Sequence, residues 1–147
     1  MIYVDTNVVV SYVNRRDPLH EAAERLVARL RSRGLVASQL VVLELFAVYS
    51  RVMKVNDIEL EAIVEYSLAT LGARVEQVEC VKLFAEAQRY AHVLRLRTLD
   101  LLHVVSAYLL GAEGIATFDR DIVAKSTTIE ETLGLRVYTS PQPSNRS

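Results

Sequence analysis

The feature that most constrains this chain is the alternation of short apolar, strand-like runs with longer helical patterns. The strand-like runs are Met1–Val4, Leu35–Ala37, Arg74–Val78, Gly114–Thr117 and Leu135–Tyr138. The segments between them carry apolar residues at helical spacing, as Leu19, Ala23, Leu26 and Leu30 do. Strands separated by helices form βαβ units, in which the strands run parallel and helices cover both faces of the sheet. We therefore predict an α/β fold, a three-layer α/β/α sandwich on a short parallel sheet of four to five strands.

The length of the chain, 147 residues, is that of one domain. We assign residues 1–138 to this domain and predict a flexible tail over residues 139–147, which are polar and include two prolines. The apolar runs are too short for a membrane span, and the single cysteine cannot form an internal disulfide. We therefore expect a cytoplasmic protein with no membrane partner. The net charge of −1 excludes binding of nucleic acid by bulk positive charge, so such binding would need a local patch.

Four carboxylates lie at strand ends or in apolar helices. Asp5 and Asp119 follow the first and fourth strand-like runs. Glu44 is the sole charge in the helical stretch LVVLELFAV, and Asp100 begins a second apolar helical stretch. Because the carboxyl ends of parallel strands meet at one edge of the sheet, we expect these four acids to converge in a crevice there.

Each of these acids also has a simpler interpretation when it is taken alone. Asp5 can cap the next helix, Asp100 can interact with a helix dipole, and Asp119 can belong to an Asp-rich turn. A structural Glu44 would need a buried arginine as its partner. Four separate explanations would then be required together, which favours a shared site.

Carboxylates that share one crevice repel one another, and a divalent cation removes that repulsion. Mg²⁺ and Mn²⁺ prefer carboxylate and water oxygens. The chain has only 3 histidines and 1 cysteine, which disfavours a zinc site. A carboxylate site that keeps water on the metal suits hydrolysis of phosphodiesters.

At these positions the sequence resembles the PIN-domain family, and within it the VapC-type toxins of prokaryotic toxin–antitoxin pairs. The matching segments are MIYVDTNVVV, SQLVVLEL, TLDLLHVVSA and ATFDRDI. The resemblance implies a PIN-like version of the sandwich. It also implies a magnesium- or manganese-dependent endoribonuclease that cleaves single-stranded RNA with water activated by the metal.

The resemblance also implies roles for individual residues. The implied catalytic acids and metal ligands are Asp5, Glu44, Asp100 and Asp119, with Asp121 as a further ligand that only some members carry. The small polar residues implied to orient the ligands or the water are Thr6, Asn7 and Thr117.

Partners are indicated by charge, by apolar surface and by the resemblance. Arg95, Arg97 and Arg120 lie near the acids in sequence and can attract single-stranded or structured RNA, although a solvated helix face explains them as well. The helical stretches 39–52 and 57–71 carry more apolar side chains than one hairpin can bury, which indicates a homodimer interface or a groove for a partner helix. In VapC-type proteins a VapB-like antitoxin fills such a groove.

Several alternatives stay open at this point. The chain can be a PIN nuclease of RNA processing or decay without an antitoxin, or a non-catalytic PIN scaffold that binds RNA or protein. A haloacid-dehalogenase-like phosphatase is disfavoured because Asn7 stands where that chemistry needs a second aspartate. His103 shares a helix face with Asp100, where a structural core histidine is the simpler interpretation and assistance in proton transfer is the other.

Overall fold

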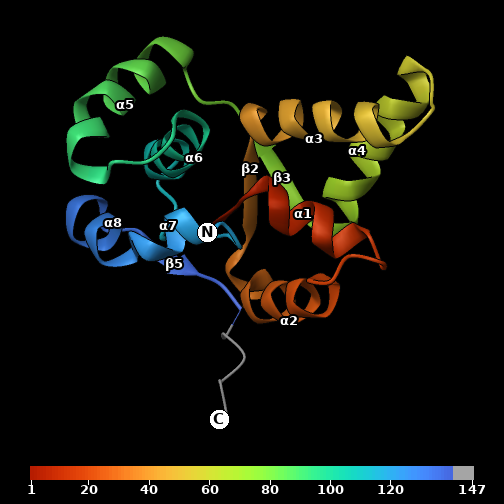
Figure 1. Ribbon diagram of the computed structural model, residues 1–147, viewed down its shortest axis with the longest axis horizontal. Helices are drawn as coiled ribbons and strands as arrows, with labels where there is room; N and C mark the ends of the chain where they lie inside the picture. The colour runs from red at the N-terminus through yellow and green to blue at the C-terminus, as the bar shows by residue number, and fades with distance from the viewer. Residues whose placement is uncertain (141–147) are drawn as a thin grey trace.

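The computed structural model describes residues 1–140, which form three layers with a parallel sheet in the middle (Figure 1). The strands are β1 Ile2–Val4, β2 Leu35–Ser38, β3 Ala73–Glu76, β4 Gly114–Ala116 and β5 Arg136–Tyr138. All neighbouring strands are parallel, in the order β3-β2-β1-β4-β5. The predicted α/β/α sandwich is therefore confirmed, with five strands. Most of the tail predicted over 139–147 lies outside the described residues.

Helices α1 to α4 cover one face of the sheet and α5 to α8 cover the other (Figure 1). Their bounds are α1 Thr6–Val13, α2 His20–Leu30, α3 Gln39–Val52, α4 Asp57–Leu71, α5 Cys80–Leu94, α6 Thr98–Leu109, α7 Arg120–Ala124 and α8 Ser126–Leu133, with a 3-10 turn, η1, at Arg31–Arg33. The chain runs outward from β1 to β2 and β3 and then returns to β4 and β5. Because crossovers between parallel strands are right-handed, this reversal moves the later helices to the opposite face.

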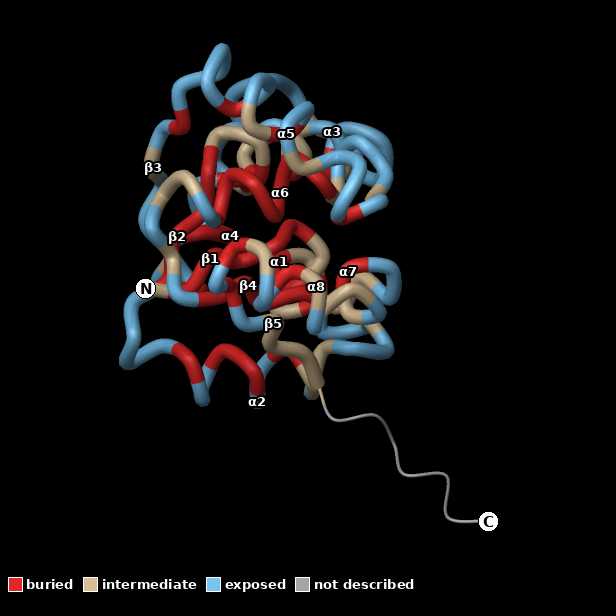
Figure 2. Tube along the Cα trace, turned by 90° about the vertical axis from the view of Figure 1, so that its left-hand side faces the viewer, coloured by how far each residue is buried: buried red, intermediate tan, exposed pale blue. Residues whose placement is uncertain are grey.

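Burial follows the layers. Figure 2 shows the buried residues concentrated in the strands and in the helices that pack directly on them. The segment Leu101–Ala107 of α6 is buried at every position, which explains its apolar sequence. None of the helices within residues 1–140 is both long and apolar enough to cross a membrane.

The strand order reverses between β1 and β4, which is the point where parallel sheets of this kind bind ligands. These two strands pair from Ile2 with Gly114 to Val4 with Ala116, so both end at the same level. The amide of Asp5 then donates a hydrogen bond to the carbonyl of Ala116 (2.9 Å). The residues that follow β1 and β4 therefore lie side by side, as expected at a topological switch point.

Gly114, at the start of β4, leaves no room for a larger side chain. A Cβ atom at this position would lie 2.7 Å from the carbonyl oxygen of Arg136 and 2.5 Å from Cε2 of Tyr138. We expect Gly114→Ala to lower the free energy of unfolding by about 2 kcal/mol, because backbone of β5 must move. Urea denaturation followed by circular dichroism measures this change.

Gly111→Ala is the matched control for this substitution. Gly111 has a φ of +73° but no atom within 4 Å of the added Cβ, so it tests backbone strain alone. We expect a smaller loss there, about 1 kcal/mol. Equal stability of Gly114→Ala and the wild type would contradict the close approach of β4 and β5.

Candidate active site

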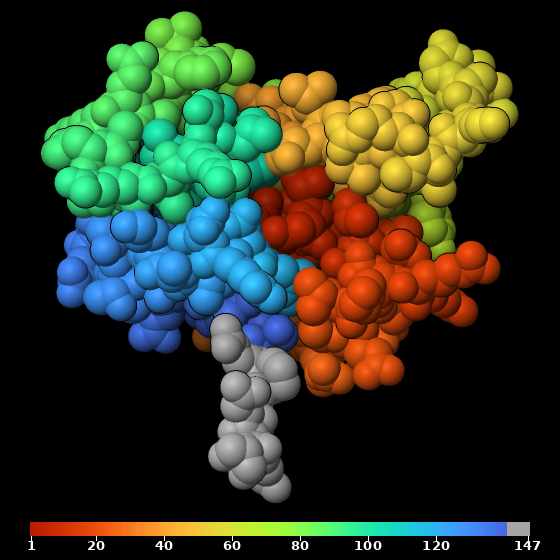
Figure 3. All heavy atoms as spheres, viewed as in Figure 1, coloured from red at the N-terminus to blue at the C-terminus, as the bar shows by residue number. Residues whose placement is uncertain are grey.

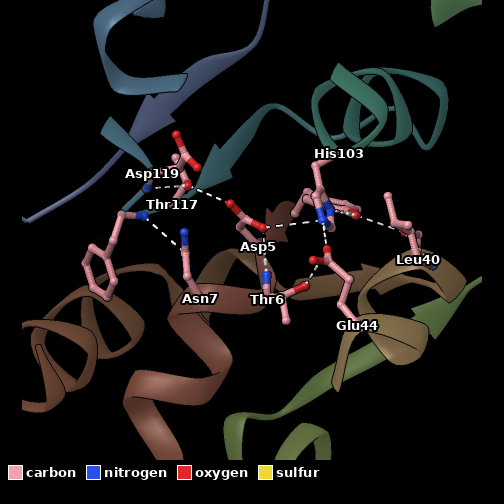
Figure 4. Close-up of polar contacts among 11 residues, drawn as sticks. Asp5, Thr6, Asn7, Leu40, Glu44, His103, Thr117 and Asp119 are labelled. Carbon is pink, nitrogen blue, oxygen red and sulfur yellow. Dashed lines mark hydrogen bonds and ion pairs between the residues drawn. The ribbon is translucent and has the colours of Figure 1, made fainter. Parts of the chain in front are cut away.

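The candidate site lies at the carboxyl ends of β1 and β4, and we refer to this cluster of polar side chains as the crevice (Figure 4). Asp5 follows β1, and the residue is only 5% exposed. Its Oδ1 accepts a hydrogen bond from the amide of Thr6 (2.8 Å), and its Oδ2 accepts one from the hydroxyl of Thr117 (2.7 Å). Asp5 thus caps α1 and is also held as an oriented carboxylate, so the two interpretations of its sequence position are compatible.

Glu44 reaches the crevice from the second turn of α3 (Figure 4). Its Oε1 accepts a hydrogen bond from the hydroxyl of Thr6 (3.1 Å) and is in contact with Nε2 of His103. A hydroxyl and a histidine therefore take the place of the arginine that a purely structural glutamate would need.

Asp119 follows β4 and caps the short helix α7. Its Oδ1 accepts hydrogen bonds from the amides of Asp121 (2.8 Å) and Ile122 (3.3 Å). Its own amide donates to the hydroxyl oxygen of Thr117 (3.0 Å). Since Thr117 also donates to Asp5, one threonine connects the acids at the ends of the two strands.

The remaining small polar residue, Asn7, fixes the loop after β4. Its side-chain oxygen accepts a hydrogen bond from the amide of Phe118 (3.2 Å). Asn7, Thr6 and Thr117 therefore all contact either an acid of the crevice or the loop that carries one. The orienting role implied for these three residues stays a prediction.

The five predicted acids lie in two groups of potential ligands. The groups are Asp5 with Glu44 and His103, and Asp100 with Asp119 and Asp121. Within each group, one ligand atom from each residue lies within 4.8 Å of the others. In the space-filling view of Figure 3, the dark-red N-terminal segment meets α3, α6 and α7, which carry these side chains. Segments far apart in the sequence thus supply both groups of ligands.

The acids of the crevice make one another harder to ionise. Burial, followed by the negative charges of Asp119 and Asp5, raises the pKa of Asp100 to about 6. Burial likewise raises the pKa of Asp5, although His103 and Thr117 oppose this effect. Carboxylates whose ionisation is penalised in this way fit a hard divalent cation, which compensates their charge.

His103 also opposes the effect of burial on the pKa of Glu44. Burial acts to raise the pKa of Glu44, but the hydrogen bond and the charge of His103 outweigh it and leave the pKa below its ordinary value. For His103, burial acts to lower the pKa, and Glu44 and Asp5 reverse this and raise it. These three groups therefore behave as one electrostatic unit.

The contacts of His103 with two of the acids are the main feature that the sequence analysis did not predict. The residue is buried, as the simpler interpretation required, at 2% exposure. Its Nε2, however, contacts Glu44 and lies 3.6 Å from Oδ1 of Asp5. The only signal in the sequence was its position three residues after Asp100, on the same face of α6.

The three arginines predicted to bind RNA are exposed. Arg120 begins α7, directly after Asp119. Arg95 ends α5 in a left-handed conformation (φ 51°), and Arg97 precedes α6. Arg95 and Arg97 thus belong to the loop that leads to Asp100. Their contact with RNA stays a prediction.

Fold and site together define a small α/β domain with clustered acids at the switch point of a parallel sheet. The family model of the PIN domain matches residues 2–126. The chain therefore belongs to the PIN-domain family. No curated protein matches it.

The fold is similar to those of several VapC proteins. VapC20 from Mycobacterium tuberculosis has a TM-score of 0.66 and 23% identity, over 84% of this chain and 94% of that chain. VapBC2 from Rickettsia felis has a TM-score of 0.67 and 16% identity, over 96% and 100%. VapBC-1 from nontypeable Haemophilus influenzae has a TM-score of 0.65 and 20% identity, over 95% and 98%. At these identities the likeness shows a shared fold.

The raised pKa of Asp100 predicts that replacing this carboxylate with a neutral side chain stabilises the folded protein, and that the gain depends on pH. Folding favours the protonated carboxyl, so Asp100 supports the fold below its unfolded pKa of 3.8, and this support is lost as the pH rises through about 6. We expect Asp100→Asn in EDTA to raise the unfolding free energy at pH 7.5 by about 1 kcal/mol, after allowance for solvent screening of this partly exposed group. Urea denaturation between pH 4 and 7.5 measures this effect.

The gain should shrink toward zero as the pH falls to 4. Glu131→Gln on the exposed side of α8 is the matched control and should show no such trend. An Asp100→Asn protein that is less stable than the wild type at pH 7.5 would contradict the repulsion.

Proposed function

We propose that this protein is a magnesium- or manganese-dependent endoribonuclease that cleaves single-stranded RNA, and that it is the toxin of a VapBC-type toxin–antitoxin pair. The observation that carries the proposal is the presence in a PIN domain of two groups of acids, Asp5 with Glu44 and Asp100 with Asp119, that influence one another electrostatically. Among proteins of similar fold, VapC20 is described as a toxin that cleaves the sarcin–ricin loop. Two others are described as VapBC structures.

The donor set of the crevice supports Mg²⁺ or Mn²⁺ as the cofactor. Asp5, Glu44, Asp100 and Asp119 would hold the cation, with Asp121 as a further ligand from the exposed rim. The cation would supply activation of water and stabilisation of the charge that develops on the phosphate. Thr6, Asn7 and Thr117 keep the carboxylates and the loop after β4 in place while the substrate binds.

The substrate is a phosphodiester chain, which needs positive charge near an acidic crevice. Arg120 beside Asp119, and Arg95 and Arg97 on the loop before α6, are exposed and suited to contact phosphates. Because water rather than the ribose 2′-hydroxyl is the nucleophile, the products carry 5′-phosphate and 3′-hydroxyl ends.

A homodimer and a VapB-like antitoxin are the protein partners we propose. Large apolar side chains are exposed along the α3–α4 hairpin, namely Leu43, Val52, Met53, Ile58 and Tyr66. A groove between α3, α4 and β3 is lined by Val42, Phe46, Val64, Leu68 and Val75, among others. Exposed apolar surface of this kind favours a protein partner, and an amphipathic helix fits a groove between two helices.

The nuclease activity predicts metal-dependent cleavage of a fluorescent single-stranded RNA. We expect cleavage with Mg²⁺ or Mn²⁺ and none with EDTA. Asp5→Asn and Asp119→Asn should each reduce the rate by more than about 1,000-fold, since several kcal/mol of transition-state stabilisation are lost. Glu131→Gln keeps the active site and should cleave like the wild type.

The ends of the products test the mechanism separately from the rate. We expect 5′-phosphate and 3′-hydroxyl ends by mass spectrometry. Products with 2′,3′-cyclic phosphate would rule out water as the nucleophile. A wild-type protein that binds RNA, but that neither binds a cation nor cleaves the RNA, would favour the scaffold alternative.

The toxin role predicts growth arrest when the protein is produced alone in a bacterial host. Asp5→Asn should remove the arrest, because the arrest depends on cleavage. Colony counts after induction measure this effect. A wild-type protein that cleaves RNA in vitro without slowing growth would instead favour a role in RNA processing or decay.

A further inference from the structure

A chain of buried hydroxyl groups lies behind the acidic crevice, and the proposed function does not explain it. The hydroxyl of Tyr3 lies 2.8 Å from Oγ of Ser38 and 2.8 Å from Nδ1 of His103. Tyr3 and Ser38 are completely buried, and His103 is nearly so. The strand β1, the end of β2 and the middle of α6 thus meet through three polar side chains inside the apolar core.

The hydrogen bonds of this chain can run in one direction, from Ser38 through Tyr3 to His103. Ser38 Oγ already accepts a hydrogen bond from the amide of Leu40 (3.3 Å), which leaves its own hydrogen free to reach Tyr3. Burial raises the pKa of Tyr3 far above its ordinary value, so Tyr3 keeps its hydroxyl hydrogen. That hydrogen can then be donated to Nδ1 of His103.

The partner at Nδ1 determines whether His103 turns an N–H group or a lone pair at Nε2 toward the acids. An imidazole that accepts at Nδ1 carries its hydrogen at Nε2, and a doubly protonated imidazole carries one there as well. Only the neutral form with its hydrogen at Nδ1 would turn the Nε2 lone pair toward Glu44 and Asp5. Two carboxylates facing a lone pair repel it, so the surroundings on both sides of the ring select Nε2–H.

We propose that His103 is a positioning residue of the metal centre. Tyr3 fixes the imidazole ring of His103, and the Nε2–H of this ring holds Glu44 and faces Asp5 without itself binding the cation. The inference rests on the proposed function, because it concerns the same site. The inference gives different roles to the two groups of potential ligands. Asp100, Asp119 and Asp121 form a group of oxygens alone, whereas the inner group contains a nitrogen that acts as a hydrogen-bond donor.

The test uses two substitutions that differ in the donor. Glutamine can place a side-chain N–H near the position of Nε2, whereas leucine fills a similar volume without any donor. Groups that orient metal ligands typically change metal affinity by about 10- to 100-fold when they are removed. We therefore expect His103→Leu to weaken Mg²⁺ binding by about 10- to 100-fold in calorimetric titration, and His103→Gln to stay within about threefold of the wild type.

Tyr3→Phe tests the hydroxyl behind the ring, and His92→Leu is the surface control. Tyr3→Phe keeps the aromatic ring but frees Nδ1, so it should weaken Mg²⁺ binding less than His103→Leu does. His92 is exposed on α5, and its substitution should leave the affinity unchanged. Equal affinity of His103→Leu and the wild type would overturn the inference while leaving the metal centre itself intact.

Nitrogen NMR of the wild-type protein reports directly which ring nitrogen of His103 carries a hydrogen. We expect Nε2 of His103 to carry a hydrogen both without and with Mg²⁺, with the resonance assigned by its loss in His103→Gln. An Nε2 without hydrogen in the Mg²⁺-bound protein would make His103 a ligand and overturn the inference. So would equal loss of binding in both His103 variants. A wild-type protein that binds neither Mg²⁺ nor Mn²⁺ would overturn the proposed metal centre and the inference with it.

Discussion

The buried charge of Asp5 is the constraint on which the rest of the structure depends. An isolated carboxylate inside a protein costs several kcal/mol unless it is hydrogen-bonded or paired. The structure compensates it from three directions, through the amide of Thr6 at the start of α1, the hydroxyl of Thr117 after β4, and the ring of His103 in α6. One side chain therefore constrains three elements, namely the start of α1, the end of β4 and the orientation of α6.

This compensation is incomplete, because burial still raises the pKa of Asp5 despite these three partners. Asp100 and Asp119 add further negative charge within reach of Asp5, as the raised pKa of Asp100 shows. A fold selected for stability alone would replace such acids with neutral side chains. The domain instead keeps them at the mouth of a crevice, where a cation can supply the charge that the protein itself lacks.

The fold and the acids could be predicted from sequence because their signals are local. Strand-like runs such as the one before Asp5 are short and apolar, and the parallel arrangement brings their ends to one edge. The isolated charge of Glu44 in an apolar helix was also visible in the sequence. The contact between Glu44 and His103 was not, because it joins residues 59 positions apart on helices from opposite layers. The same holds for Thr117, whose bond to Asp5 depends on the pairing of β1 with β4.

The pairing of the first strand with the fourth also affects the order in which the protein is made. β1 leaves the ribosome first, but its partner β4 begins only at Gly114. Before residue 100 is synthesised, Asp5 and Glu44 are the only two of the four acids present in the nascent chain, and Thr117 has yet to follow. A contact across 112 residues forms late, because the intervening segment must be ordered first. The acids that follow β1 and β4 are therefore brought together only after β4 and Thr117 have been synthesised, so the chain must hold the buried charge of Asp5 without this partner until then.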